Sequence, residues 1–324
     1  MHRRTLLKTI AAGAATSAAP WAAAQAMSDQ PLRWIVPYPA GGGTDVLART
    51  VAEAMRQTLG QQIVVDNRPG ASTNIGGQAV ATAKADGYTI MSADNAILAY
   101  NEHLFSKLPF SPQNDFTYVG GISRFPLALV VHPSFEAKTM KEFLAYVRAN
   151  PGKVNYASPG NGSPHHLAME MFKNRTKTFL THIPYRGAAP AMADVMGGQV
   201  PCMFLDLASG LSVIQSGKVR ALAIGSAKRI ATLPDVPTLG EVGVADTEVF
   251  AFQGILGPKG LPANVTQRLN ADLNKALASP AVVKRMQDFG MEALPGTPEQ
   301  FRALARAEAK RWGEVIKAAG VKLD

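Results

Sequence analysis

The chain has 324 residues, of which 33 are Lys or Arg and 24 are Asp or Glu. A hydrophobic fraction of 47% and a charged fraction of 18% are typical of a folded protein and exclude a disordered one. The length favours two domains. The single cysteine, Cys202, excludes an intramolecular disulfide, a C-x-x-C redox pair and a cysteine-rich zinc site.

Residues 1–26 have the pattern of an export signal. Arg3, Arg4 and Lys8 precede an uncharged, alanine-rich stretch that ends in the A-x-A triplet 24–26. The adjacent arginines resemble a twin-arginine signal, although paired arginines also occur in Sec signals. We therefore predict a periplasmic protein that is cleaved near Ala26. The remaining residues hold 30 basic and 24 acidic side chains, a net charge of +6. The basic residues are scattered, which argues against nucleic acid and favours small anionic solutes.

Short apolar runs alternate with helical patterns along the rest of the chain. This alternation predicts an α/β fold of mainly parallel sheets with helices on both faces. The expected strands are 32–38, 62–66, 88–92, 127–131, 154–157, 179–183, 200–205 and 219–225. The expected helices are 44–59, 74–85, 140–149, 189–196, 264–278, 280–289 and 298–318. Gly290 and Gly320 are expected to end the last two helices.

We predict that the chain crosses between domains at two segments. Gly120–Pro126 breaks two apolar runs, and 226–248 is rich in Pro and Gly with little periodicity. We predict one lobe from 27–123 plus 250–324 and a second from 124–249. Two crossings between α/β lobes would form a hinge with a ligand cleft between the lobes.

Three loops that follow strands and precede helices are candidates for ligand binding, because open α/β sheets bind ligands beyond the carboxyl ends of their strands. The first contains Gly41–Gly43 followed by Thr44 and Asp45. Glycines allow close backbone approach, and a helix N-terminus favours anions. No Gly-Lys-Ser/Thr follows, which excludes a nucleotide P-loop. The alternative is a tight turn capped by Thr44 or Asp45.

The second and third loops carry hydroxyl and amide donors. In the second, 67–76, Ser72, Thr73 and Asn74 either cap the following helix or donate to a ligand. In the third, 157–167, a carboxylate could be bound by Ser158, by Ser163 and by the backbone amides of Asn161, Gly162 and Ser163.

Metal and hydrolase chemistry are poorly supported. His166 and Glu170 would share a helix face next to His165, but no third ligand is nearby, so we expect structural or capping histidines, no metal and no cofactor. An exported hydrolase using Ser163 and His166 is the alternative function. The chain lacks a G-x-S-x-G elbow and a supported S-x-x-K motif, so we expect no enzyme. Cys202 lies in an apolar run and is expected to be buried and inert.

Taken together, these segments resemble the Bug-type receptors, the extracytoplasmic solute-binding proteins of tripartite tricarboxylate transporters. The matching segments are PYPAGGGTD (37–45), VDNRPGASTNIGG (65–77), ADGYTI (85–90), NYASPGNGSPHHLA (155–168), PYRGAAPAMADVMGGQV (184–200), GKVRALAIGSAKR (217–229), LPDVPTLGEVG (233–243) and AEAKRWGEVIKAAG (307–320). Two departures are small. Ser72-Thr73 stands where the family often has glycine, and His165 is added before the usual His-Leu pair. Both flank the expected cleft and are expected to tune ligand choice.

The resemblance implies a two-lobed periplasmic binding protein that closes on a small organic acid. The implied partners are a carboxylate ligand and, transiently, the membrane subunits of a transporter or a sensor; we expect a monomer and no nucleic acid. The implied ligand-binding residues are Tyr38, Gly43, Thr44, Ala71, Ser72 and Thr73 in lobe one and Ser158, Gly162, Ser163 and Asp206 in lobe two; Asn161 and His166 complete the predicted set.

Asp206 has two interpretations within this set. A carboxylate in the cleft would favour a ligand ammonium or exclude a second anion. Alternatively, Asp206 caps a helix that follows the strand ending at Leu205. The identity of the acid stays open among dicarboxylates, tricarboxylates, amino acids and aromatic acids.

Overall fold

The computed structural model describes residues 30–41, 43–245 and 247–324, so the predicted export signal lies outside the described residues. Its strands are β1 (Leu32–Val36), β2 (Ile63–Asn67), β3 (Thr89–Asp94), β4 (Phe116–Val131), β5 (Asn155–Ser158), β6 (Thr181–Pro184), β7 (Cys202–Asp206), β8 (Arg220–Ile224), β9 (Phe250–Pro258) and β10 (Glu292–Ala293). Its helices are α1 (Gly43–Leu59), α2 (Asn74–Ala81), α3 (Asn101–Leu104), α4 (Met140–Ala149), α5 (Pro164–Thr176), α6 (Ala188–Met196), α7 (Leu207–Gln215), α8 (Ala263–Leu277), α9 (Pro280–Asp288) and α10 (Pro298–Ala319), with single turns η1 (Ala71–Thr73) and η2 (Ala96–Tyr100).

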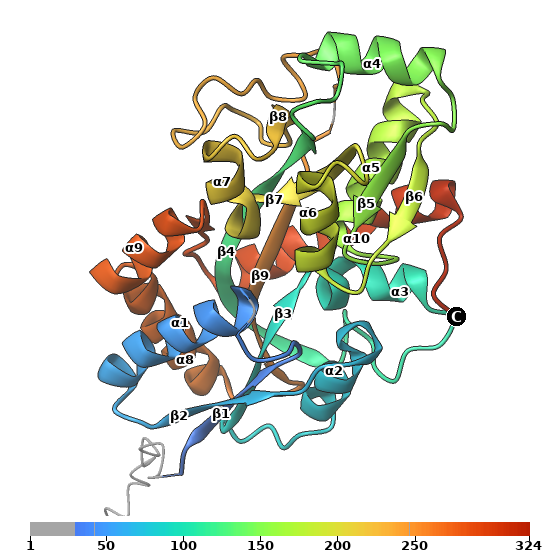
Figure 1. Cartoon of the computed structure of the whole chain (residues 1–324). Helices are drawn as coiled ribbons and strands as arrows, with labels where there is room; N and C mark the ends of the chain where they lie inside the picture. Colours follow the sequence, from blue (N-terminus) through green and yellow to red (C-terminus); the bar gives the residue numbers. More distant parts are fainter. Residues whose placement is uncertain (1–29, 42, 246) are drawn as a thin grey trace, which may run out of the picture.

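The strands form one mixed sheet in the order β2-β1-β3-β9-β4-β7-β5-β6, with β8 and β10 also paired to β4. We call β2, β1 and β3 the first half and β7, β5 and β6 the second half; within each half the strands are parallel. Between them lie β9 and β4, each antiparallel to its neighbours in the sheet. Figure 1 shows the two halves joined by the long strand β4. The predicted α/β class with mainly parallel strands is confirmed.

Strand β4 passes from one half of the sheet to the other. Its residues 116–126 pair with β9, and its residues 127–131 pair with β7 and β8. The segment Gly120–Pro126, which the sequence suggested as a crossing between domains, lies inside β4 and is continuous strand. Gly120 and Gly121 serve close packing there: a Cβ would meet Asn270 Nδ2 at 2.8 Å in the first case and Leu294 at 2.9 Å in the second. Sequence alone also did not reveal β9.

Helices cover both faces of the first half. One face packs against α1, α8 and α9 around the buried Trp34, and the other packs against α2 and the first turns of α10 around Phe252 and Phe301. Thr297 caps α10 with Gln300 in a reciprocal capping box, and Gly320 ends it with a left-handed φ of 65°. No helix in the described part of the chain is long and apolar enough to cross a membrane.

The second half of α10 belongs to a different core. Trp312 and Ile316 pack with Tyr100 and Leu104 and with residues of α4, α5 and β7 in one cluster. The Tyr100 and Trp312 rings meet edge to face, 5.3 Å apart. Residues 99–104 and 309–316, which the predicted division assigns to lobe one, therefore share a core with the second half of the sheet. This shared core ties the two halves together beside β4.

Candidate functional site

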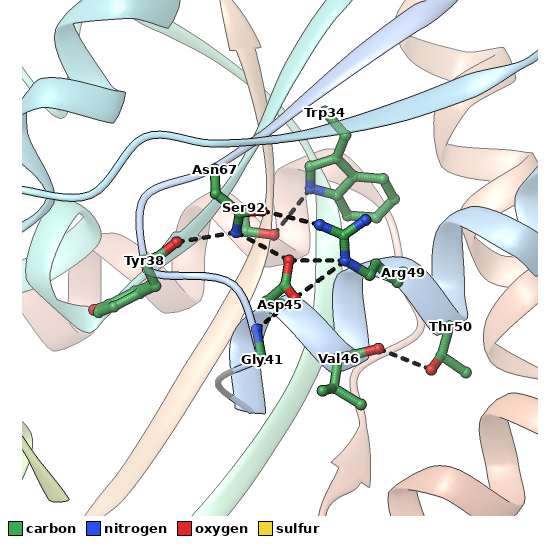
Figure 2. Close-up of polar contacts among 9 residues, drawn as sticks. All are labelled: Trp34, Tyr38, Gly41, Asp45, Val46, Arg49, Thr50, Asn67 and Ser92. Atoms are coloured by element: carbon green, nitrogen blue, oxygen red, sulfur yellow. Dashed lines mark hydrogen bonds and ion pairs between the residues drawn. The ribbon is translucent and has the colours of Figure 1, made fainter.

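The turn that contains the first glycine loop is stabilised by hydrogen bonds to the side chain of Asp45. The Asp45 side chain is buried and accepts from Gly41 N at 2.9 Å, from Arg49 Nε at 3.0 Å and from Asn67 Nδ2 at 2.9 Å. Asn67 also donates to the Tyr38 carbonyl at 3.0 Å, so the turn is joined to β2 (Figure 2). Burial alone would raise the pKa of Asp45, but the hydrogen bonds from Arg49, Gly41 N and Asn67, together with the charge of Arg49, lower it. The capped-turn interpretation of Asp45 fits these contacts, and Gly43 and Thr44 remain accessible at the start of α1.

Tyr38 belongs to a buried network behind this loop. Its hydroxyl donates to Asp94 Oδ2 at the end of β3, and Ala96 N donates to the other oxygen at 3.1 Å. Burial raises the pKa of Asp94 more than these hydrogen bonds lower it, and burial beside Asp94 raises the pKa of Tyr38. The Tyr38 hydroxyl is thus already engaged within the protein.

The second loop has an unusual backbone. Ala71, Ser72 and Thr73 are consecutive non-glycine residues with φ values of 46°, 49° and 77°. Left-handed conformations at such residues are costly and cluster at functional sites. Asn101 Nδ2 supports the loop by donating to the Ser72 carbonyl at 2.8 Å and to Asn74 Oδ1 at 2.7 Å. Thr73 does not cap α2, because its hydroxyl donates to the Ser72 carbonyl instead. The Ala71 and Ser72 side chains are exposed.

The third loop differs because most of its donors are used within the protein. The contacts are Gly160 N to Ser158 Oγ at 3.1 Å, Gly162 N to His166 Nδ1 at 3.1 Å, Ser163 N to the Gly160 carbonyl at 3.3 Å and His166 N to Ser163 Oγ at 3.3 Å. Ser163 is therefore the N-cap of α5. Ser158 is fully buried, whereas Asn161 is exposed.

A stack of rings backs this loop. The His166 and His182 rings are 4.0 Å apart and nearly parallel, and Tyr156 stacks on His182 at 4.8 Å. His182 Nε2 lies 2.6 Å from Ser158 Oγ, at hydrogen-bonding distance. Burial lowers the pKa of His166, and burial together with His166 lowers the pKa of His182 to about 4. Both imidazoles are consequently neutral at pH 7. Glu170 accepts from the Tyr156 hydroxyl at 2.6 Å, which anchors the stack to α5.

Asp206 forms a buried pair with His165 near this loop. It caps α7 by accepting from Ser209 N at 2.8 Å, which is the capping alternative predicted for it. Its Oδ2 also accepts from Ser209 Oγ at 2.7 Å and from His165 Nε2 at 3.0 Å. Burial would raise the pKa of Asp206, but the hydrogen bonds from His165 and Ser209 lower it. The carboxylate is therefore held in its anionic form between two helix N-termini.

The short helix α3 contacts both the second and the third loop. Asn101, at its start, holds the Ser72 carbonyl, and Leu104, at its end, packs against Gly162, where a Cβ would lie 2.8 Å from Leu104 Cδ1. Leu323 N donates to the Leu104 carbonyl at 3.0 Å, so the C-terminal tail fixes α3 in this position. The four residues of α3 thus connect the second and third loops, which lie about ninety residues apart in the sequence.

Several residues of these networks escaped sequence reasoning. His182, Asp94 and Asn101 lie outside the three loops and carry no local motif. The ends of β3 and β6 were a usable signal, because β3 runs parallel to β1 and β6 runs parallel to β5. Each strand therefore ends on the side of the sheet where its own half carries the candidate loops. Cys202 is buried as expected, and burial raises its pKa. Within the described ranges no group of three His, Cys, Asp or Glu could hold a metal ion.

The chain is similar to known proteins along nearly its whole length. Residues 47–321 match the family model described as the tripartite tricarboxylate transporter family receptor. The protein BugT of Bordetella pertussis is 37% identical over 295 residues, which cover 91% of this chain and 90% of BugT.

Three solved structures are similar in both fold and sequence. The periplasmic binding protein BugD has a TM-score of 0.80 at 37% identity, covering 90% of this chain and 98% of BugD. The R. palustris protein Rpa4515 with adipate has a TM-score of 0.82 at 33% identity, covering 90% and 98%. MatC from Rhodopseudomonas palustris with bound malate has a TM-score of 0.77 at 32% identity, covering 88% and 98%. None of these relatives supports the hydrolase alternative.

Proposed function

Because this chain belongs to the tripartite tricarboxylate transporter receptor family, we propose that it captures a small organic acid and delivers it to transporter subunits in the membrane or to a sensor. The family consists of solute-binding receptors with a periplasmic-binding-protein fold, so the chain is a solute-binding protein. The carboxylate ligand, the partner and the monomeric state are our proposals for this chain.

The observation that carries the proposal is the strained loop at Ala71–Thr73. Three non-glycine residues hold left-handed conformations at the start of α2, which has no side-chain cap. Each such residue costs on the order of 1–3 kcal/mol, and such strain persists where function requires the backbone geometry. An anion at this helix start would receive backbone N–H groups and the favourable end of the helix dipole.

Similar proteins support a carboxylate as the ligand. Rpa4515 was solved with adipate and MatC with malate, and both cover most of this chain. The first and second loops are joined to each other around β1 and β2 through Asn67, and the third reaches them through α3. We propose that Gly43, Thr44, Ala71, Ser72 and Thr73 bind one carboxylate. On this proposal, the third loop and Asp206 form the opposite wall of the site.

A thermal-shift screen followed by calorimetry tests the proposal. Dicarboxylates, tricarboxylates, amino acids and aromatic acids should include at least one compound that raises Tm, because a ligand that binds only the folded state stabilises it by mass action. Neutral sugars are the control. Recovery of the ligand unchanged after incubation distinguishes binding from catalysis. Stabilisation by sugars alone, or chemical conversion of the bound acid, would contradict the proposal.

We also propose that the protein works in the periplasm after cleavage near Ala26. We further propose that its two lobes are 27–123 plus 250–324 and 124–249, with residues 99–104 and 309–316 of the first lobe packed into the core of the second. The predicted signal motivates the first statement, and the passage of β4 between the two halves of the sheet motivates the second. Mass spectrometry of the exported protein should find Met27 as the first residue. An intact N-terminus in a periplasmic extract would refute cleavage.

A further inference from the structure

His165 carries an unexplained polar atom beside the proposed site. The residue is only 8% exposed and stands in the first turn of α5, two positions after the N-cap Ser163. Its Nε2 donates to Asp206, the N-cap of α7, so the ring lies between the N-termini of two helices. Its Nδ1 is buried and has no hydrogen-bond partner among the residues that the structure describes. Buried polar atoms without a partner are rare and costly, and each requires an explanation.

The contacts of Asp206 define what His165 Nδ1 can do. The Asp206 carboxylate is anionic and accepts the hydrogen on His165 Nε2. In the neutral imidazole, this tautomer leaves the Nδ1 lone pair free to accept a hydrogen bond. Asp206 itself is fully engaged, because Ser209 N and Ser209 Oγ also donate to it. A ligand group that reaches this place therefore meets an acceptor backed by a negative charge. Such a place attracts a hydrogen-bond donor and repels a second carboxylate.

We propose that His165 Nδ1 accepts a hydrogen bond from a hydroxyl or ammonium group of the ligand, so that the protein selects carboxylates bearing such a donor over the same acids without it. This inference rests on the proposed function and adds the ligand's second recognition element. Lobe one supplies the carboxylate contact, and the His165–Asp206 pair reads the donor. A donor group satisfies the buried nitrogen, whereas a methylene in its place leaves the nitrogen unpartnered. Discrimination of this kind is strong where the polar atom of the site is buried.

The experiment compares matched acids that differ by one donor. Binding is measured by calorimetry at pH 7.5 with the full mature chain. Malate and aspartate, which carry a donor, are compared with succinate, and lactate and alanine are compared with propionate. The wild type should bind at least one donor-bearing acid about tenfold or more tightly than its partner without the donor. His165→Leu should reduce that preference to within about twofold, while the affinity for the acid without the donor stays within about threefold.

Two variants separate recognition from folding. His165→Gln keeps an amide that can donate to Asp206 and a carbonyl that can accept from the ligand, so it should retain part of the preference. His132→Leu changes a histidine in the turn after β4 that contacts Ser134, and it should leave the preference unchanged. If His165→Leu does not fold, the wild-type preference and its partial retention in His165→Gln decide the matter.

The outcomes distinguish the two proposals. Carboxylate binding with equal affinity for both members of every pair overturns the role of His165 but leaves the proposed function intact. Tighter binding of succinate than of malate and aspartate also overturns it, because it shows that the site takes a second carboxylate instead. A preference that persists in His165→Leu assigns the donor contact to another residue and overturns the inference. Binding of no carboxylate at all overturns both proposals.

Discussion

The loops of the two sheet halves have the same position in the fold but opposite hydrogen-bonding states. The loop at Ala71–Thr73 exposes two of its side chains, has a strained backbone and begins a helix without a side-chain cap. The loop from Ser158 to Ser163 uses its amides and hydroxyls internally and rests on a stack of two histidines and a tyrosine. The first is built to receive a group from outside, and the second is built to hold its own shape. This difference is the basis of our proposal that the first half captures the ligand and that a rigid wall in the second half selects it.

The largest expected effect concerns the support of the first loop. Asp45→Ala removes the acceptor of Gly41 N, Arg49 and Asn67 at a buried position. Removing hydrogen bonds to a buried charge should lower the free energy of unfolding by about 2–4 kcal/mol and should abolish carboxylate binding. Urea denaturation and calorimetry measure the two effects. Glu241→Ala, which removes an exposed pair with Arg229 and a hydrogen bond from Thr238 N, is the control and should change stability much less than Asp45→Ala. Full ligand affinity in Asp45→Ala would show that the loop needs no such support.

A second change tests capture without disturbing the fold. A Cβ at Gly43 would have no atom within 4 Å, and Gly43 has no left-handed φ, so Gly43→Phe should leave Tm within a few degrees of the wild type. The ring would fill the space in front of the helix start, and we expect at least a hundredfold loss of carboxylate affinity, about 2.7 kcal/mol. Gly240→Phe, at an exposed turn with its nearest neighbour 3.7 Å away, is the matched control. Unchanged binding in Gly43→Phe would remove the first loop from the site.

How much of this contrast can be predicted from the sequence depends on how far apart in the sequence the interacting residues lie. Helix α4 was predicted with its observed bounds, and the capping box of Thr139 and Glu142 at its start involves only residues close in sequence. The strain at Ser72 was not visible, because a serine carries no signal for a left-handed φ. His182 was missed for a different reason: its partner Ser158 lies on a neighbouring strand 24 residues away. Strand β9 was hidden by its glycines, one of which, Gly254, leaves room for the Phe301 ring.

The stacked histidines of the second half, His166 and His182, predict that the stability of the fold depends on pH. The folded pKa values of His166 and His182 lie below the ordinary value of about 6.5, so the unfolded chain binds more protons between that value and about 4. Stability should therefore fall as pH drops from 6.5 towards 4, by about 1–2 kcal/mol from His182 after allowance for its partial exposure. Denaturation at pH 7.5 and pH 5 measures this slope. His182→Phe keeps a stacked ring but removes the titration, and it should flatten the slope; an equal slope in that variant would place the titrating group elsewhere.

The smallest effect separates capping from ligand contact in the third loop. Ser163 Oγ accepts from His166 N as the N-cap of α5, so Ser163→Ala should lower stability by about 1 kcal/mol. If the hydroxyl has no further role, carboxylate affinity should change by less than about twofold. Ser163→Asp restores the cap but adds a negative charge, so it should recover stability while weakening anion binding if the side chain faces the ligand. Calorimetry on both variants decides this, because a purely structural serine gives equal affinities in Ala and Asp, whereas a wall residue gives a selective loss in Asp. The second outcome would mean that the internally bonded loop also forms part of the wall that faces the ligand.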